Sequence, residues 1–341
     1  MLADPARYYK GGKPDLQLFD KKLYEVNPDD KVAIARAAAE EVLGKDERII
    51  SVDSSYSDGE GSSYRLISNG FEGESKSTWF SVSASVSIKG EGEARPQDYW
   101  YDSALFYDKL TKTGIGAKAL ERVLRKLGQK KAKSGKYTMV VDPMNVGNLL
   151  SPMLSALYGS ALQQKNSFLM DKLDTKVASD LFTLRDEPHA IGANGSRYFD
   201  NEGVATEPRT VFDKGVLKTY FIDTYNGKKM DIAPTISAPS RLILTPGDKD
   251  LNGLVADIKQ GILVTGFNGG NSNSSTGDFS YGIEGFLIED GKLTQPVNEM
   301  NVTGNMVTLW NSLVAVGNDP QPNRSWQIPS LVFEGVDFSG L

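Results

Sequence analysis

The chain has 341 residues, of which 39% are hydrophobic and 24% charged, and its net charge is −6. This length suits two domains of ordinary size, and the composition is that of a soluble globular protein. No apolar run approaches the ~20 residues of a membrane helix, and the polar N-terminus lacks the apolar core of a secretory signal. We therefore expect a cytoplasmic protein without membrane association, and the acidic charge argues against direct contact with nucleic acid.

The cysteine and histidine counts limit the chemistry further. The chain has no cysteine and one histidine, which excludes disulfides, thiolate metal sites and a cysteine nucleophile. A catalytic zinc site built on histidine needs two or three of them, or histidine with cysteine or carboxylates. His189 lies in a predicted loop beside Pro188, with no second ligand nearby in sequence. We expect a structural or solvated histidine and no metal cofactor in this chain.

The first predicted helix begins at Pro28, with Asn27 as its N-cap, and ends at Gly44. Its expected buried stripe consists of Val32, Ala35, Ala39 and Val42. Two short strands should follow at 49–53 and 64–68, separated by a turn at 57–59.

The clearest strand covers 80–88, because apolar residues there alternate with serines, which places the two sets on opposite faces. A second amphipathic helix is predicted over 116–127, and it leads into a basic segment that we interpret as solvated. The cations of this segment are Arg125, Lys126, Lys130, Lys131, Lys133 and Lys136. The basic loop marks a boundary between a first domain, 1–133, and a second, 134–341.

The second domain should begin with a strand at 137–141, followed by one long helix over 146–164. Hairpin turns are predicted at 213–215 and 290–291. The mixture of helices and hairpins predicts an α+β fold, with two domains of mixed helices and largely antiparallel sheet.

The segment 268–277, with sequence NGGNSNSSTG, is the most unusual in the chain. Its composition predicts a long mobile loop, which either forms a lid or the edge of a substrate site or is a surface loop without a function. It lacks the pattern of a phosphate-binding loop. Carboxylates that could serve a hydrolase are plentiful nearby, but the sequence does not show two of them at a catalytic separation; they are Asp278, Glu284, Glu289 and Asp290.

Several stretches of the chain resemble the PmbA/TldE family, the "modulator of DNA gyrase" proteins. The matching stretches are QKNSFL at 164–169, FDNEGV at 199–204, TEPR at 206–209, KGVL at 214–217, TGDFSYG at 276–282, GF at 285–286, GNM at 304–306 and AVGND at 315–319. Their shared order and spacing extend the resemblance over nearly the whole chain. Members of the family usually carry a further N-terminal segment, so the resemblance implies that this chain lacks one.

Related TldD subunits resemble zinc metalloproteases and carry an HExxxH helix. Counting back from Lys165, the corresponding positions here are Ser151, Pro152 and Ala156. None of these side chains suits zinc, and none can act as the general base. The resemblance therefore implies a TldE-type, non-catalytic subunit whose TldD-like partner holds the zinc.

The leading hypothesis is thus a metal-free partner subunit of a peptidase complex that processes peptides and unfolded segments. Two alternatives remain, namely a stand-alone homodimeric protein that binds peptides or regulates, and a metal-independent hydrolase that uses carboxylates. The candidate contacts for peptide or partner are Lys165, Asn271, Gly277, Asp278, Tyr281 and Gly282.

Overall fold

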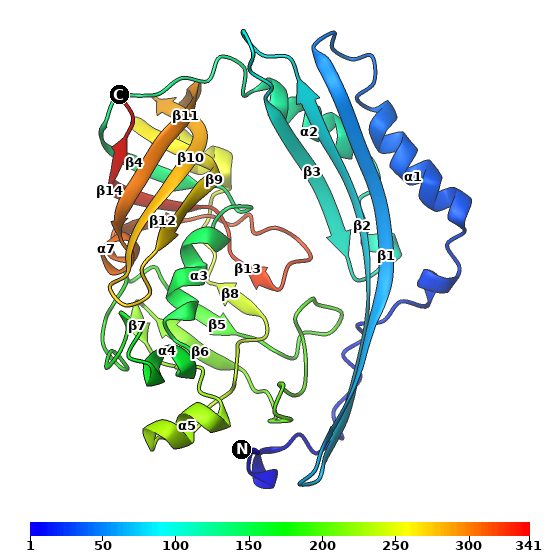
Figure 1. Cartoon of the computed structure of the whole chain (residues 1–341), viewed down its shortest axis with the longest axis vertical. Helices are drawn as coiled ribbons and strands as arrows, with labels where there is room; N and C mark the ends of the chain where they lie inside the picture. Colours follow the sequence, from blue (N-terminus) through cyan, green and yellow to red (C-terminus); the bar gives the residue numbers. More distant parts are fainter.

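The computed structural model describes residues 1–341 and shows a long sheet lying beside a larger C-terminal part (Figure 1). The strands are β1 (Ile49–Ile67), β2 (Phe71–Ile88), β3 (Gln97–Ala104), β4 (Gly135–Val141), β5 (Leu184–Asp186), β6 (Arg209–Asp213), β7 (Val216–Leu217), β8 (Leu242–Leu244), β9 (Gln260–Ser272), β10 (Asp278–Glu289), β11 (Lys292–Asn305), β12 (Leu313–Val316), β13 (Trp326–Gln327) and β14 (Leu331–Ser339).

The helices are short, and none is long and apolar enough to cross a membrane. The α-helices are α1 (Pro28–Glu40), α2 (Ile115–Leu124), α3 (Gly147–Ser155), α4 (Gly159–Gln163), α5 (Thr224–Met230), α6 (Leu251–Ala256) and α7 (Met306–Asn311). Three 3₁₀ turns, η1 (Pro5–Arg7), η2 (Lys21–Tyr24) and η3 (Tyr107–Lys109), complete the set. The predicted α+β class, with mixed helices and largely antiparallel sheet, is confirmed.

The long sheet has the antiparallel order β1-β2-β3, and α1 and α2 pack against it. The predicted strand at 80–88 is confirmed, since its five apolar residues are buried against the helices. The predicted turn at 57–59 is wrong. Asp58 pairs with Phe80, and the reversal comes ten residues later, beside Gly70 with φ of 105°. The short strands expected at 49–53 and 64–68 are therefore parts of the single strand β1, because β2 pairs with it along its whole length.

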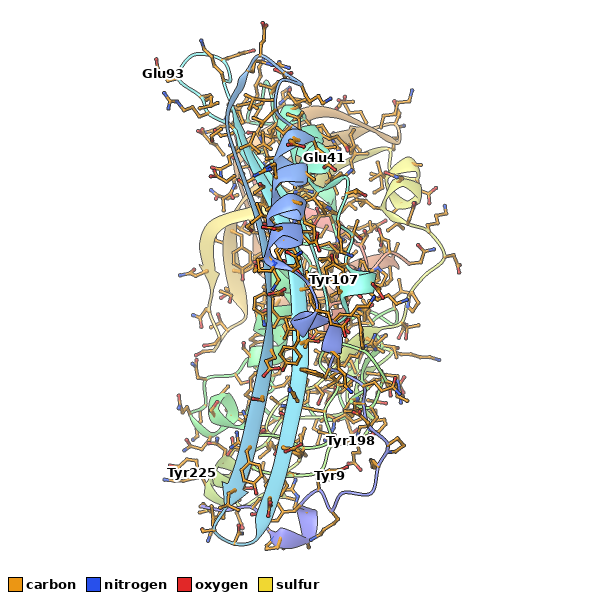
Figure 2. The ribbon with its side chains drawn as sticks, turned by 90° about the vertical axis from the view of Figure 1, so that its right-hand side faces the viewer. Tyr9, Glu41, Glu93, Tyr107, Tyr198 and Tyr225 are labelled. Carbon is orange, nitrogen blue, oxygen red and sulfur yellow. The ribbon has the colours of Figure 1, made fainter.

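The two helices of this layer are joined at their ends. Asn27 caps α1 as predicted, its side chain accepting from the Asp29 N–H. Of the predicted stripe, Val42 is buried and Ala35 and Ala39 are half-buried, but Val32 is exposed. The one buried residue within α1 is Ala38, which the prediction left out. The carboxylate of Glu41, labelled in Figure 2, accepts from the N–H groups of Gly114 and Gly116 at 2.6 and 2.8 Å. It therefore neutralises the positive end of α2.

The C-terminal part contains a six-stranded sheet of order β11-β10-β9-β4-β14-β12 and a five-stranded sheet of order β13-β8-β5-β6-β7. In the larger sheet only β4 and β9 are parallel neighbours, and β11 also pairs with β14, which curls the sheet. Both predicted hairpin turns are confirmed. Lys214-Gly215 and Asp290-Gly291 have positive φ throughout, as two-residue hairpin turns require.

The long helix predicted over 146–164 is wrong, because the chain breaks between α3 and α4. The N–H of Gly159 donates to the Phe221 carbonyl at 2.8 Å, and Tyr158 bridges to the same residue. A Cβ at Gly159 would come within 3.0 Å of the Asn226 Cβ. Of the stripe expected for this helix, Leu149, Met153, Ala156 and Leu157 are nevertheless fully buried, whereas Ala161 is half-buried. The backbone pairing between Tyr158 and Phe221 therefore interrupts the helix, although the sequence pattern is helical throughout.

Contacts from the N-terminal segment and from the end of α2 help to join the long sheet to the C-terminal part. The N-terminal segment crosses over, since the Tyr9 N–H donates to the Gly203 carbonyl at 3.0 Å and the Tyr9 ring stacks on Tyr198 (Figure 2). Lys126, predicted to be solvated, is only 9% exposed. Its Nζ lies 2.8 Å from Glu284 on β10 and 3.2 Å from Asp98 on β3. The basic run is therefore partly structural.

Candidate functional site

Four of the sequence-predicted site residues meet at α3, namely Ser151, Pro152, Asn271 and Tyr281. A pocket of about 400 Å³ lies between α3 and the β9–β10 hairpin, and it is lined by Asn148, Ser151, Pro152, Ser155, Asn271, Ser272, Ser274 and Tyr281. It brings together two of the three HExxxH-equivalent positions and two of the six candidate contacts. The lining offers hydroxyl, amide and phenol groups and no carboxylate or imidazole.

The α3 side chains do not fit a zinc ion. Ser151 is exposed and offers a neutral hydroxyl, Pro152 offers no donor atom, and Ala156 is a fully buried methyl group. Nowhere in the chain do three residues of the types His, Cys, Asp or Glu come together in a geometry that could hold a metal ion. Zinc sites take three or four such ligands, so the residues present do not fit a zinc ion.

The first half of the segment 268–277 belongs to β9, so the prediction of a long loop is wrong. The β9–β10 ladder runs as far as the Ser272–Phe279 pair, leaving a short turn at 273–277. This turn is fastened to the segment after α4. The Phe168 N–H donates to the Ser274 carbonyl at 3.0 Å, and the Asn166 Oδ1 accepts from the Ser274 hydroxyl at 2.8 Å. The hairpin therefore forms a fixed wall of the α3 pocket.

The remaining candidate contacts lie outside the pocket lining. Gly277, with φ of 81°, packs on the Phe168 ring, and a Cβ at Gly282 would come within 2.3 Å of the Asn268 carbonyl oxygen. Hydrogen bonds from Asn305 and Thr276 lower the pKa of Asp278. Lys165 is exposed just after α4. The two glycines thus serve backbone packing, whereas Asn271 and Tyr281 face the cavity.

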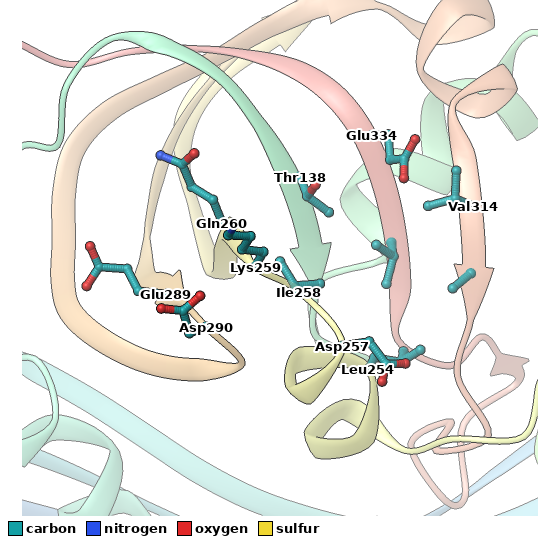
Figure 3. Close-up of a pocket in the computed structure, with 12 residues that line it drawn as sticks. Thr138, Leu254, Asp257, Ile258, Lys259, Gln260, Glu289, Asp290, Val314 and Glu334 are labelled. Carbon is teal, nitrogen blue, oxygen red and sulfur yellow. The ribbon is translucent and has the colours of Figure 1, made fainter.

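The carboxylates that sequence reading considered for a hydrolase do not form a pair. Glu284 is bonded to Lys126, and Glu289 and Asp290 line a different groove. That groove, of about 710 Å³, is larger than the α3 pocket and lies between α6 and strands of the six-stranded sheet (Figure 3). It contains none of the six candidate contacts for peptide or partner. The His189 ring is half-buried, its Nε2 lies 3.0 Å from the Thr206 hydroxyl, and burial lowers its pKa.

Sequence reading missed Asp142, which is 5% exposed at the end of β4. Burial raises its pKa from 3.8 to about 6, against the opposing effect of hydrogen bonds from Asn145. The only signal in the sequence was the Asp142-Pro143 pair, which marked the strand end. Its neighbour Asn145 also donates to the Thr265 carbonyl at 2.8 Å, so the pair joins the end of β4 to the middle of β9, where their parallel ladder stops.

The raised pKa of Asp142 predicts a pH effect on stability. The folded state holds this proton more tightly than the unfolded state, so the contribution of Asp142 to stability is greatest below about pH 4 and is lost as the pH rises through 6. We expect Asp142→Asn to remove this loss and to exceed the parent stability at pH 7.5 by about 3 kcal/mol. Urea unfolding at pH 4.5 and 7.5 measures the effect. Asp337→Asn, at an exposed position, should keep the pH dependence of the parent's stability. If Asp142→Asn also keeps it, the raised pKa of Asp142 is contradicted.

The comparisons with known proteins agree with these features. Two family models match, namely the PmbA/TldA metallopeptidase central domain over residues 21–127 and the PmbA/TldA metallopeptidase C-terminal domain over residues 134–340. The Metalloprotease PmbA homolog of Haemophilus influenzae is 30% identical over 335 residues, covering 96% of this chain and 73% of that protein. Metalloprotease PmbA of Escherichia coli O157:H7 is 28% identical over 331 residues, with the same two coverages.

Solved structures give the same result. A candidate modulator of DNA gyrase from Bacteroides thetaiotaomicron has a TM-score of 0.99 and 73% identity, over 100% of this chain and 78% of that one. TldE from Thermococcus kodakarensis has a TM-score of 0.81 at 22% identity, over 100% of this chain and 79% of that one, which is a likeness of fold alone. The resemblance seen in the sequence motifs is confirmed, and the chain belongs to the PmbA/TldD/TldE family of metallopeptidase-like proteins.

Proposed function

We propose that this chain is the metal-free partner subunit of a cytoplasmic TldD/TldE-like metallopeptidase complex that processes peptides and unfolded segments. The observation that carries the proposal is the donor set on α3, where Ser151, Pro152 and Ala156 replace every group that HExxxH would supply. The helix persists and its buried stripe is intact, so the scaffold remains although the metal ligands are absent. Zinc is then expected in a TldD-like subunit.

The chemistry of the α3 pocket supports a binding role. Its hydroxyl and amide groups suit hydrogen bonding to peptide main chain, which every sequence presents in the same way. Without a charged group, the pocket places little constraint on the side chains of a bound segment. Such tolerance is appropriate for a subunit that helps to present varied unfolded segments to a separate catalytic centre.

Reconstitution tests the proposal. The chain is mixed with a relative that carries HExxxH, and cleavage of an unstructured peptide is compared with cleavage by each protein alone. We expect cleavage by the mixture to exceed either protein alone by at least about tenfold. Ser151→Trp, which fills the pocket, should abolish most of this gain, whereas Ser160→Trp, at an exposed position outside the pocket lining, should not.

Two outcomes would overturn the proposal. If the relative cleaves equally well without this chain, the partner role fails. If this chain cleaves by itself in excess chelator, it is a metal-independent hydrolase. A homodimer that binds the peptide without stimulating the relative would instead establish the stand-alone binding protein.

A further inference from the structure

A second pocket, of about 460 Å³, lies where the long sheet meets the C-terminal part, and it is strongly cationic. Its lining includes Lys109, Arg241 and Arg324 and contains no aspartate or glutamate. Gln17, Asn194 and Gln327 add amide groups. The strand β13, which carries Gln327, lies on the side of the C-terminal part that faces the long sheet (Figure 1).

The two arginines of this pocket have no carboxylate partner. Neither forms an ion pair, and the buried Nε of Arg241 has no hydrogen-bond partner. Arg324 rests on the Tyr101 ring, with its Cζ 4.9 Å from the ring centroid. Glu187 is near enough to affect the pKa of Arg241, but its carboxylate accepts a hydrogen bond from Arg185 Nε at 2.7 Å. Burial lowers the pKa of both guanidinium groups, yet arginine stays protonated in proteins. Two partly desolvated positive charges are thus left uncompensated.

Hydrogen bonds fix the backbone of the segments that carry the two arginines. Gln327 Nε2 donates to the carbonyls of Gln321 and Arg324 at 3.2 and 2.7 Å. Asn194 Nδ2 donates to the Asn323 carbonyl at 3.2 Å. The backbone N–H of Arg241 donates to the buried Asp186 at 2.8 Å. The Arg324 guanidinium, which rests on the Tyr101 ring, therefore loses little freedom on binding, and each guanidinium presents a planar fork that matches a carboxylate.

A neighbouring pocket extends the cationic one. It has a volume of about 360 Å³, shares Leu105 and Asn194 with it, and is lined by Ser77, Ser240 and Ser325 among others. Hydroxyl groups beside a carboxylate-binding pair suit the main chain of an extended peptide. We propose that Arg241 and Arg324 bind the C-terminal carboxylate of a peptide whose preceding residues lie along the serine-lined pocket.

This site is separate from the α3 pocket, and the proposal does not require a partner subunit. Calorimetry on the isolated chain tests it with N-acetylated tetra-alanine, as the free acid and as the C-terminal amide. We expect the free acid to bind at least about tenfold more tightly, a difference of about 1.4 kcal/mol, and the preference to weaken as salt is raised.

Substitutions locate the binding. Arg241→Gln and Arg324→Gln should each remove the preference for the free acid, and Arg324→Lys should retain part of it by keeping the charge. Arg36→Gln, an exposed arginine on α1, removes the same charge elsewhere and should leave binding unchanged. Thermal unfolding verifies that each variant is folded.

The proposal is overturned if acid and amide bind equally, if neither binds, or if inorganic phosphate binds and the peptide acid does not displace it. The last result would assign the arginines to a phosphate ligand. Loss of tetra-alanine binding in Arg36→Gln would also overturn it, because the effect would then follow net charge. None of these results bears on stimulation of a metal-bearing relative, so the two proposals fail independently.

Discussion

Lys126→Met is expected to destabilise the protein by about 3 kcal/mol or more. The substitution keeps an apolar stem of similar length and removes one charge. Glu284, bonded to Lys126 at 2.8 Å and itself only 17% exposed, would be left without its cation. Asp98 would retain Arg122, whose Nε lies 3.2 Å away. The main cost is thus one unpaired carboxylate at the junction of β10 and the long sheet.

Double substitution separates that cost from loss of packing. Lys126→Met with Glu284→Met leaves no unpaired charge and should recover most of the lost stability. Lys118→Met removes an exposed pair, in which Lys118 and Glu121 lie 2.8 Å apart, and should cost less than about 1 kcal/mol. Urea unfolding followed by tryptophan fluorescence measures all three. If Lys126→Met and Lys118→Met have equal effects, the buried network does not stabilise the junction.

The junction also shows which parts of the fold the sequence could predict. Local rules succeeded where a few neighbouring residues decide the outcome, as in the Asn27 cap and the Asp290-Gly291 turn. They failed where a distant partner decides. β1 stays extended across a turn-like sequence with glycine at 59, because every residue there pairs with β2. The helix ends after α3, because the Gly159 N–H donates to the Phe221 carbonyl. Lys126 was read as solvated because its acidic partner Glu284 is 158 residues away.

The candidate site was predicted unevenly for the same reason. The family motifs led to α3 and to the β9–β10 hairpin, which the structure places on two walls of one pocket. The motifs did not indicate which of their residues line the pocket and which serve backbone packing. Gly282 is required by its close approach to Asn268, whereas Asn271 and Tyr281 face the cavity. The unpaired arginines Arg241 and Arg324 belong to segments far apart in sequence, so no local pattern could have joined them.

Restoring the full motif on α3 should fail, and position 156 is the reason. Ala156 is 0% exposed, and its carbonyl accepts a hydrogen bond from the buried Ser167 hydroxyl at 2.6 Å. Ala156→His therefore places a larger, polar ring in a filled core, which we expect to cost about 3 kcal/mol. Ser151 is exposed and Pro152 half-buried, so Ser151→His and Pro152→Glu should be tolerated. Glutamate at 152 also restores an N–H that proline lacks within a helix.

Comparison of the double variant, Ser151→His with Pro152→Glu, and the triple variant that adds Ala156→His tests this expectation. Urea unfolding should assign nearly all the loss of stability to position 156. Metal analysis of the triple variant should find no stoichiometric zinc, because the chain offers no cluster of further ligands to complete a site. A stable triple variant that holds one zinc per chain would contradict both expectations. It would mean that α3 can shift outward enough to turn residue 156 toward the pocket. The packing of the helix would then not prevent metal binding, and only the identities of the three side chains would.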